Sequence, residues 1–202
     1  ASPKPGLTEA EFQDYWLHVH AVKYASKIPQ IRRYKLGMRV DWQYETAQPL
    51  WSGFAEIWLK NEQEQLASLQ TPEFLEGARM DEPRWAAFWN TQVLDCDTVT
   101  VKGQPGEAAP VGGEGAVKLV VLLKRRPGLS VEEYRERHLE SYAPRCAEPA
   151  EVLRHEVCFT RDSWYVLGEP RFDCAVHSWF ESVAAAEAYA ASLASRARVL
   201  PD

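Results

Sequence analysis

The spacing of apolar residues near the start of the chain predicts an amphipathic helix. Phe12, Trp16, Val19 and Val22 recur every three or four residues, so a helix would gather them into one apolar stripe. We expect this helix to end near Pro29, because proline cannot continue a helical hydrogen-bond ladder. Capping signals mark the expected starts of this helix and of two others: Thr8-x-x-Glu11, Asn61-x-x-Glu64 and Ser130-x-x-Glu133.

Other stretches follow the pattern of β-strands. Residues 31–40 and 51–59 alternate in the first half, and residues 93–101 are expected to form the last strand of that half. Residues 117–124 form an apolar run of the kind found in buried strands. The order of these elements predicts a β-α-β-β-α-β arrangement, which is the ferredoxin-like plan of an α+β protein.

The chain repeats itself with a period near 120 residues. Pro5-Gly6-Leu7 matches Pro127-Gly128-Leu129 at an offset of 122, and residues 55–61 match residues 176–182 at an offset of 121. So long a period indicates two copies of one domain rather than a solenoid. The expected organisation is a first repeat over residues 1–103, a linker rich in Pro, Gly and Glu over 104–115, and a second repeat over 116–202.

The two copies are incomplete in complementary ways. The first has no counterpart of residues 117–124, and the second has no last strand. We therefore expect the natural chain to have further residues at its ends.

Composition narrows the function classes. The 202 residues carry 23 Lys and Arg against 29 Asp and Glu, a net charge of −6, with no basic run of the kind that nucleic acid needs. The longest aliphatic run is only residues 119–123, and no signal-peptide pattern is present, so we expect a cytoplasmic protein without a membrane partner. The four cysteines show no CxxC pair, which argues against a zinc ribbon and favours reduced thiols.

Four motifs of the first copy carry a family resemblance. They are Pro5-Gly6-Leu7-Thr8, Phe12-x-x-Tyr15-Trp16-x-x-x-His20-Ala21, Pro29-x-Ile31-Arg32-Arg33-Tyr34 and Gly53-x-Ala55-Glu56-x-Trp58. In these motifs the sequence resembles the EthD-like proteins of the dimeric α+β barrel superfamily. The resemblance implies two ferredoxin-like units whose sheets pack into one barrel, here within a single chain, and hence a monomer or a weak homodimer. It further implies relatives such as polyketide cyclases, muconolactone-type isomerases, cofactor-free oxygenases and decarboxylases or dehydratases.

Three residues are candidates for acid–base catalysis. His20 continues the apolar stripe of the first helix, where it would serve as a general acid/base or simply bind a helix-end carbonyl. Glu56 lies in a predicted strand between apolar neighbours. It would serve as an acid in a pocket, as the partner of His20, or as one side of a structural ion pair with a nearby arginine. His177 occupies the matching strand of the second copy, as an acid/base or as a structural residue.

Aromatic residues and one further histidine are the candidates for substrate binding. The repeat alignment sets His155 opposite Arg33 and replaces the Trp16 and His20 of the first copy by His138 and Tyr142. The two copies should therefore differ in chemistry, and we expect the first to be the active one. The expected substrate-binding residues are Trp16, Trp58, Tyr34, Tyr142, Trp179 and His155.

These features favour an enzyme that works without cofactor or metal. The expected reactions are proton transfers on a small aromatic or polyketide-derived molecule: cyclisation, isomerisation, dehydration or decarboxylation. A non-catalytic binding protein and a cofactor-free monooxygenase are the alternatives, and a haem protein would need His18, His20, His155 or His177 as its axial ligand.

Overall fold

The structure is a computed structural model, and it describes residues 1–44, 49–105 and 115–197. The chain folds into two compact units, residues 1–92 and residues 93–202. The central part of the expected linker, residues 106–114, lies outside the described residues, as do residues 198–202 of the expected second repeat.

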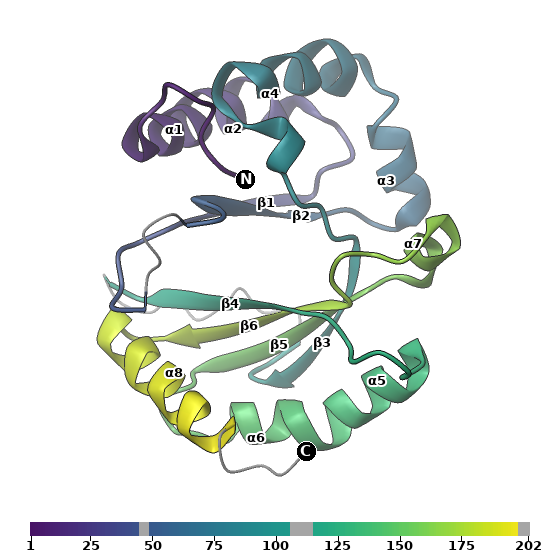
Figure 1. The fold of residues 1–202 in the computed structure, drawn as a ribbon. Coiled ribbons are helices and arrows are strands. Elements are labelled where there is room, and N and C mark those ends of the chain that lie inside the picture. Colours follow the sequence, from purple (N-terminus) through teal and green to yellow (C-terminus); the bar gives the residue numbers. More distant parts are fainter. Residues whose placement is uncertain (45–48, 106–114, 198–202) are drawn as a thin grey trace. The chain divides into compact units, whose positions relative to one another are not determined.

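The first unit packs helices on one face of a two-stranded antiparallel sheet (Figure 1). Strands β1 (Arg33–Met38) and β2 (Gly53–Trp58) pair from Arg33 opposite Trp58 to Met38 opposite Gly53. Its helical segments are α1 (Glu9–Tyr15), η1 (Trp16–His20), α2 (Ala21–Lys23), η2 (Ala25–Lys27), α3 (Glu62–Ser68), η3 (Glu73–Ala78), α4 (Arg79–Trp85) and η4 (Phe88–Asn90).

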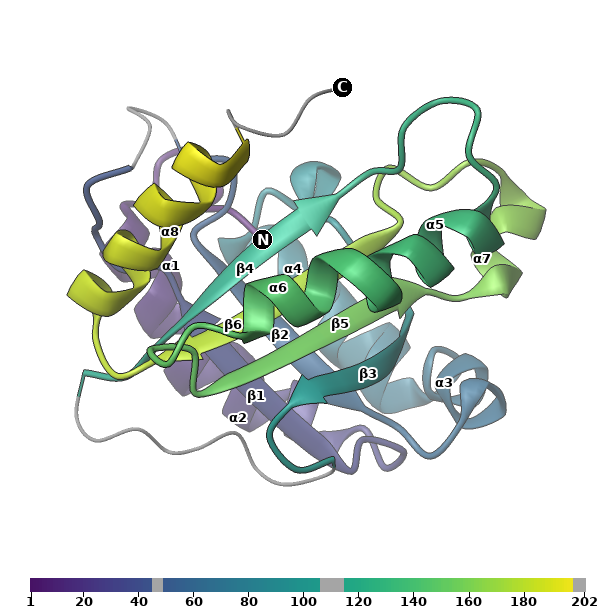
Figure 2. The ribbon, with the colours of Figure 1, turned by 90° about the horizontal axis from the view of Figure 1, so that it is seen from below.

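The second unit is a four-stranded antiparallel sheet in the order β3-β5-β6-β4, with helices α5 and α6 along one face (Figure 2). Both sheets are antiparallel and both units mix helix and strand, which is consistent with the expected α+β, ferredoxin-like class. The strands are β3 (Cys96–Lys102), β4 (Val117–Leu123), β5 (Arg154–Thr160) and β6 (Cys174–Phe180), and the helices are α5 (Val131–Arg137), η5 (His138–Tyr142), α6 (Ala143–Ala147), α7 (Asp162–Leu167) and α8 (Val183–Ala197).

The two repeats open in the same way. Thr8 and Ser130 each accept a hydrogen bond from the backbone three residues later, and Glu11 and Glu133 bond back to complete both capping boxes. After seven helical residues, each helix passes into a π-helical turn, η1 in the first unit and η5 in the second. A π-turn is rare and often marks a functional position, so its presence in both segments is consistent with the expected repeat.

The strand registers correct the repeat alignment by one residue. Arg33 pairs with Trp58 in the first unit, and Arg154 pairs with Trp179 in the second, an offset of 121 for both strands. His155 is therefore the counterpart of Tyr34, and its alignment with Arg33 is wrong. The one-residue deletion must fall in the connection between helix and strand, because a slip inside a strand would turn every side chain to the other face.

Strand β3 does not join the sheet of the first unit. We expected it to be the last strand of the first repeat, but it pairs with β5, from Cys96 opposite Thr160 to Lys102 opposite His155. The boundary between the compact units consequently falls at Gln92 and Val93, ahead of the expected end of the first repeat at residue 103.

Each unit has its own apolar core. In the first unit, aromatic residues of the helices pack against the sheet; this cluster includes Phe12, Trp16, Trp85, Leu36, Met38 and Ala55. In the second, residues on the helix side of the sheet, including Val157 and Val176, pack beneath Ala143. Phe180 and Tyr189 anchor α8 in a further cluster. No helix of the described residues is long and apolar enough to cross a membrane.

Candidate functional site

His20 lies at the end of the η1 turn and is bound to a carboxylate. Its Nδ1 is 2.9 Å from Oδ2 of Asp81, which comes from α4 and is 61 residues away in the sequence. His20 is 6% exposed and Asp81 1% exposed, so the pair is almost fully removed from water. The polar partner of His20 is thus a side-chain carboxylate from another helix, which replaces the helix-end carbonyl considered for it.

The second oxygen of Asp81 is also occupied. Tyr15 donates its hydroxyl to Oδ1 over 2.8 Å, and Nη1 of Arg84 lies 3.8 Å from the same atom. Desolvation, and then the hydrogen bond to Asp81, raise the pKa of Tyr15. Asp81 is therefore a buried carboxyl group whose two oxygens hold Tyr15 and His20 in fixed positions, so both of its oxygens have hydrogen-bond partners.

Aromatic rings surround the His20–Asp81 pair. The Trp85 ring lies 4.8 Å from the ring centroids of both His20 and Trp16. Nε1 of Trp16 donates to the hydroxyl of Tyr34 over 3.0 Å, and burial raises the pKa of Tyr34 to about 12. Nε1 of Trp85, a residue only 3% exposed, makes no hydrogen bond within the described part of the chain. A buried N–H without an acceptor is uncommon and calls for an explanation.

Sequence reasoning missed Asp81, Trp85 and Tyr15. Asp81 and Trp85 are four residues apart on one helix, so they share a face. An acidic residue on the same face as a large apolar one was the sequence signal that could have identified Asp81 as a candidate. The pairing with His20 could not be read from the sequence, because it depends on how α4 packs against η1.

Glu56 is not brought to His20. Its neighbour Ala55 packs against the aromatic core beneath the helices, and strand alternation turns Glu56 and Trp58 to the opposite face of the sheet. Lys35 is its cross-strand neighbour, and the guanidinium of Arg33 lies 5.2 Å from the Trp58 ring. The role of Glu56 as partner of His20 is therefore wrong, because Asp81 takes that place.

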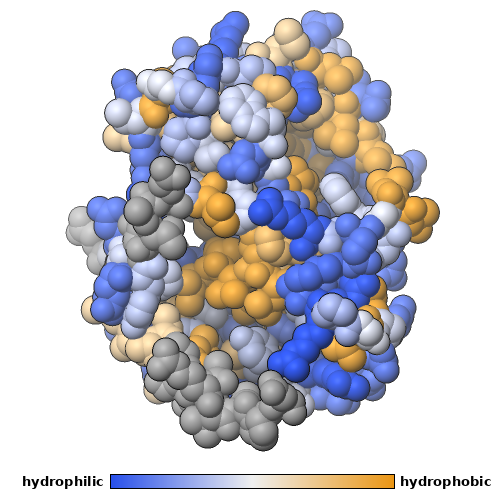
Figure 3. All heavy atoms as spheres, viewed as in Figure 1, coloured by the Kyte–Doolittle hydropathy of each residue, from blue (hydrophilic) through white to orange (hydrophobic). Residues whose placement is uncertain are grey.

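An open cleft of about 470 Å³ lies beside the same helix in the first unit. His20 does not line it, although Leu17 and Ala21 on either side in the sequence do. Figure 3 shows that apolar side chains reach the surface on the face drawn there, rather than being confined to the interior. The lining residues are Leu17, Ala21, Val22, Ser26, Tyr34 and Leu36.

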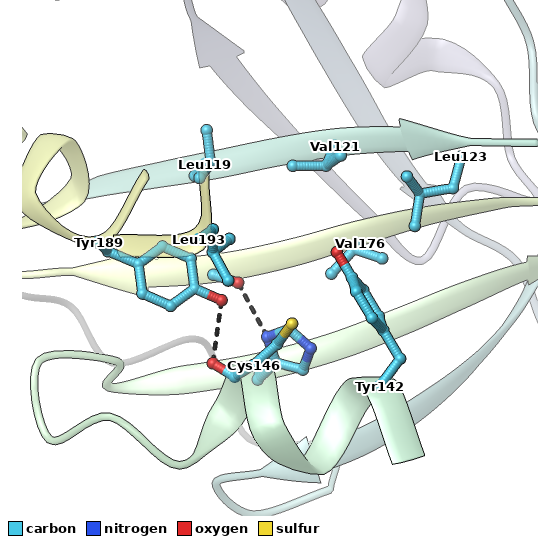
Figure 4. A pocket seen from close by; sticks show the side chains of 10 residues that line it. Leu119, Val121, Leu123, Tyr142, Cys146, Val176, Tyr189 and Leu193 are labelled. Carbon is cyan, nitrogen blue, oxygen red and sulfur yellow. Dashed lines mark hydrogen bonds between the residues drawn. The ribbon is translucent and has the colours of Figure 1, made fainter. Parts of the chain in front are cut away.

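The second unit places different groups between its helices and sheet. Nδ1 of His155 lies 2.8 Å from the hydroxyl oxygen of Ser178, and both residues border a small cavity of about 20 Å³ (Figure 4). Tyr142 from η5 and Tyr189 from α8 flank Cys146 at this cavity, and the Tyr189 hydroxyl donates to the Cys146 carbonyl over 3.0 Å. About one water molecule fits such a space, so this cavity admits no substrate as it stands.

Burial keeps the histidines of this region neutral. Desolvation lowers the pKa of His138 to about 4, and desolvation together with neighbouring positive charge lowers that of His155 to about 4. Nε2 of neither ring makes a hydrogen bond to the described residues. Burial raises the pKa of Tyr142 to about 12, so its hydroxyl stays protonated at neutral pH.

His177 and Trp179 share the face of the second sheet that points away from α5 and α6. Their rings are 5.8 Å apart, and the neighbouring residue Val176 belongs to the helix-side core. Nε of Arg154 donates to Glu156 over 2.9 Å on the same face, and Nζ of Lys118 stands 4.4 Å from the Trp179 ring. The sheet separates these groups from the His155–Ser178 pair.

The described residues hold no group of three or more His, Cys, Asp or Glu side chains placed to bind a metal ion. His18 lies 3.7 Å from Asp14 on an exposed helix face, apart from the other histidines.

One comparison with known proteins gives a match. The family model described as EthD domain matches residues 4–88, which supports an EthD-like protein and covers the helices of the first unit up to Phe88, both its strands and the His20–Asp81 pair. No curated protein and no solved structure matches the chain. The match supports an EthD-like domain over these residues, and the chemistry of the domain is argued from the site.

Proposed function

We propose that the protein is a cofactor-independent enzyme that uses His20 as a general acid/base on a small, mostly aromatic or polyketide-derived molecule. The reaction is a proton transfer that results in cyclisation, isomerisation, dehydration or decarboxylation. The observation that carries this proposal is the buried pair of His20 and Asp81, 2.9 Å apart, inside an EthD-matched unit. A buried histidine oriented by a carboxylate is the arrangement that general acid–base catalysis uses.

Each residue of the pair has a distinct task. A carboxylate oxygen accepts hydrogen bonds, so we assign the proton of this hydrogen bond to Nδ1 of His20. Nε2 is then the nitrogen that takes a proton from the substrate and returns it later in the reaction. Asp81 is a positioning residue that fixes the tautomer and stabilises the imidazolium formed in between.

Trp85 offers a second interaction to the same substrate. Its Nε1–H is buried, lacks an acceptor among the described residues, and belongs to a ring centred 4.8 Å from that of His20. A substrate carbonyl that accepts this hydrogen bond would have its enolate stabilised while His20 removes the neighbouring proton. Since His20 is only 6% exposed, a small and flat substrate fits this approach best.

The remaining parts of the proposal concern the whole chain. We propose a tandem of two EthD-like repeats that form an intramolecular α+β barrel, and hence a monomer or weak homodimer. Shared capping boxes, shared π-turns and equal strand registers support the tandem. A cytoplasmic location is also part of the proposal, and it rests on the sequence alone. Glu56, Trp58, His177 and Trp179 lie on the sheet faces that point away from the helices of their units. We therefore propose that any role they have in catalysis or substrate binding is exercised there and not through His20.

A substrate panel with matched variants tests the function. The protein is incubated without added metal with small aromatic and poly-β-keto acids, and products are identified by mass spectrometry. We expect conversion of at least one compound, a loss of about 10²–10⁴-fold in turnover for His20→Ala, and no loss for the exposed control His18→Ala. Conversion that survives His20→Ala would refute the assignment, and binding without conversion would favour the non-catalytic binding protein.

A further inference from the structure

We infer that Tyr15 is a positioning residue for the proposed reaction: its hydroxyl holds the carboxyl group of Asp81 in the orientation that keeps the ring proton of His20 on Nδ1. This inference rests on the proposed function, because it concerns the same His20–Asp81 pair. It adds a residue that acts on the reaction only through that pair.

Two hydrogen bonds fix the carboxyl group of Asp81, one at each oxygen. The Tyr15 hydroxyl donates to Oδ1 over 2.8 Å, and Nδ1 of His20 lies 2.9 Å from Oδ2. Burial, followed by the hydrogen bond to Asp81, raises the pKa of Tyr15, so its hydroxyl keeps its proton and donates at neutral pH. Asp81 is 1% exposed, so the protein and not the solvent determines how its carboxyl group is turned.

Arg84 cannot replace the Tyr15 hydroxyl. Its Nη1 lies 3.8 Å from Oδ1 of Asp81, which is beyond hydrogen-bond distance, and its side chain is 66% exposed. A solvated ion pair of this kind contributes little and does not fix a direction. The directed contact at Oδ1 is therefore the one from Tyr15.

The orientation of the carboxyl group decides where the proton of His20 lies. The last torsion of an aspartate side chain is broad and roughly two-fold, so one hydrogen bond alone does not fix the plane of the group. Without the Tyr15 hydroxyl, rotation about this torsion would move Oδ2 away from Nδ1 of His20. A neutral imidazole carries its single proton on either nitrogen, according to the hydrogen bonds that the ring makes. Part of the proton population would then occupy Nε2, the nitrogen that must be free to accept a proton from the substrate.

The π-turn explains how Tyr15 and His20 reach the same carboxyl group. Tyr15 ends α1 and immediately precedes η1, and His20 is the last residue of η1. Residues five apart lie about 140° from each other around a regular α-helix, and hence on different faces. In η1 the backbone N–H of Ala21 bonds to the carbonyl of Trp16, five residues earlier, so residues at this spacing come onto one face.

The second repeat replaces both of these residues while it keeps the frame. It has the same capping box and the same π-turn, but at the offset of 122 it has Arg137 in place of Tyr15 and Tyr142 in place of His20. The two side chains that bond to Asp81 are thus present together in one repeat and absent together from the other. This joint replacement is expected if Tyr15 serves His20.

The tautomer of His20 is the direct test, and it requires no substrate. Tyr15→Phe keeps the ring that stacks on Trp85, with centroids 6.5 Å apart, and removes only the hydroxyl. In ¹⁵N spectra of the labelled full chain, with His20 assigned by His20→Ala, Nδ1 of the parent should have the shift of a protonated nitrogen. In Tyr15→Phe this shift should move toward that of an unprotonated nitrogen. Tyr24→Phe is the matched control, because it removes another phenolic hydroxyl near His20, from a ring centred 6.2 Å away, and it should leave the shift unchanged.

Turnover then tests the link to catalysis. With the substrate found in the panel, Tyr15→Phe should lower kcat about tenfold with little change in KM, since one hydrogen bond to the pair is lost and Tyr15 acts only through it. In the background of Asp81→Asn, the further change Tyr15→Phe should add little, because both substitutions disturb the same group.

Three outcomes would overturn the inference, provided that circular dichroism shows the variants folded. They are an Nδ1 shift that is the same in Tyr15→Phe and the parent, an equal fall of kcat in Tyr24→Phe, and full additivity of Tyr15→Phe with Asp81→Asn. If Tyr15→Phe does not fold, Asp81→Asn should move the Nδ1 shift in the same direction, and an unchanged shift there would overturn the inference as well. Turnover that survives His20→Ala would instead refute the proposed function, whatever the tautomer shows.

Discussion

Nδ1 of His20 and Oδ2 of Asp81 lie 2.9 Å apart, between two helices whose residues are separated by 61 positions in the chain. The contact joins η1 to α4, so the π-turn that positions His20 and the helix that carries Asp81 are held by the same interaction. The first unit thereby has a polar pair in the middle of an otherwise aromatic cluster.

Asp81→Asn should reduce kcat by about 10²-fold or more with little change in KM, because the amide keeps the shape but no longer fixes the tautomer or balances the imidazolium. Turnover of the substrate found in the panel measures the effect. Asp14→Asn is the control, since Asp14 lies 3.7 Å from the exposed His18, and this solvated pair is on the helical segment that carries His20. Equal activity of both variants would leave Asp81 with a structural role only.

Much of the fold could be predicted from local sequence. Both capping boxes, the Asn61 cap and the strands at 33–38, 53–58, 96–102 and 117–123 correspond to signals within a few residues of each element. Local signals succeed here because caps and strand alternation depend on neighbours in the chain.

Long-range placement was beyond these signals. The sheet that β3 joins depends on which edge is free after folding, and the alternating Val99 and Val101 suit either edge. The partner of His20 similarly depends on helix packing, which set Asp81 in the place expected for Glu56. The equivalence of Tyr34 and His155 was hidden as well, because an alignment by identity does not see which face a side chain occupies.

Thr8→Ala and Ser130→Ala should each lower thermal stability by a similar amount, because the two hydroxyls cap equivalent helices. For a chain of this size the loss of one cap corresponds to a fall of about 2–4 °C in Tm. Calorimetry of each variant and of the double variant checks this, and Ser26→Ala, whose hydroxyl bonds a carbonyl outside any cap, is the comparison. A change confined to one variant would show that the two repeats do not share this start.

Sedimentation should show a monomer or a weakly associating dimer. In the proposed tandem, one chain would supply both halves of the barrel that relatives are expected to form from two chains, so association would not be required to complete it. Equilibrium runs over a wide concentration range measure the association constant. A dimer that persists at the lowest concentration and in which each chain donates one sheet to a shared barrel would contradict the tandem arrangement.

Acid should destabilise the protein between about pH 6.5 and pH 4 through His138 and His155. Burial lowers the pKa of each ring to about 4, whereas the unfolded chain protonates histidine near 6.5. In that window the unfolded state binds more protons than the folded state, so the free energy of unfolding falls as pH falls. Above it both states are neutral and the full stability is present.

The size of this acid effect and its assignment to the two histidines can both be measured by urea unfolding at pH 7.5 and pH 5. Each unit of pKa difference corresponds to about 1.4 kcal/mol, which makes the combined effect a few kcal/mol at most. His138→Gln should reduce the pH dependence, because it removes one of the two buried rings, and His18→Gln, at a ring that is 65% exposed, should leave it unchanged. A pH dependence that is the same in the parent and both variants would assign the acid sensitivity to other groups.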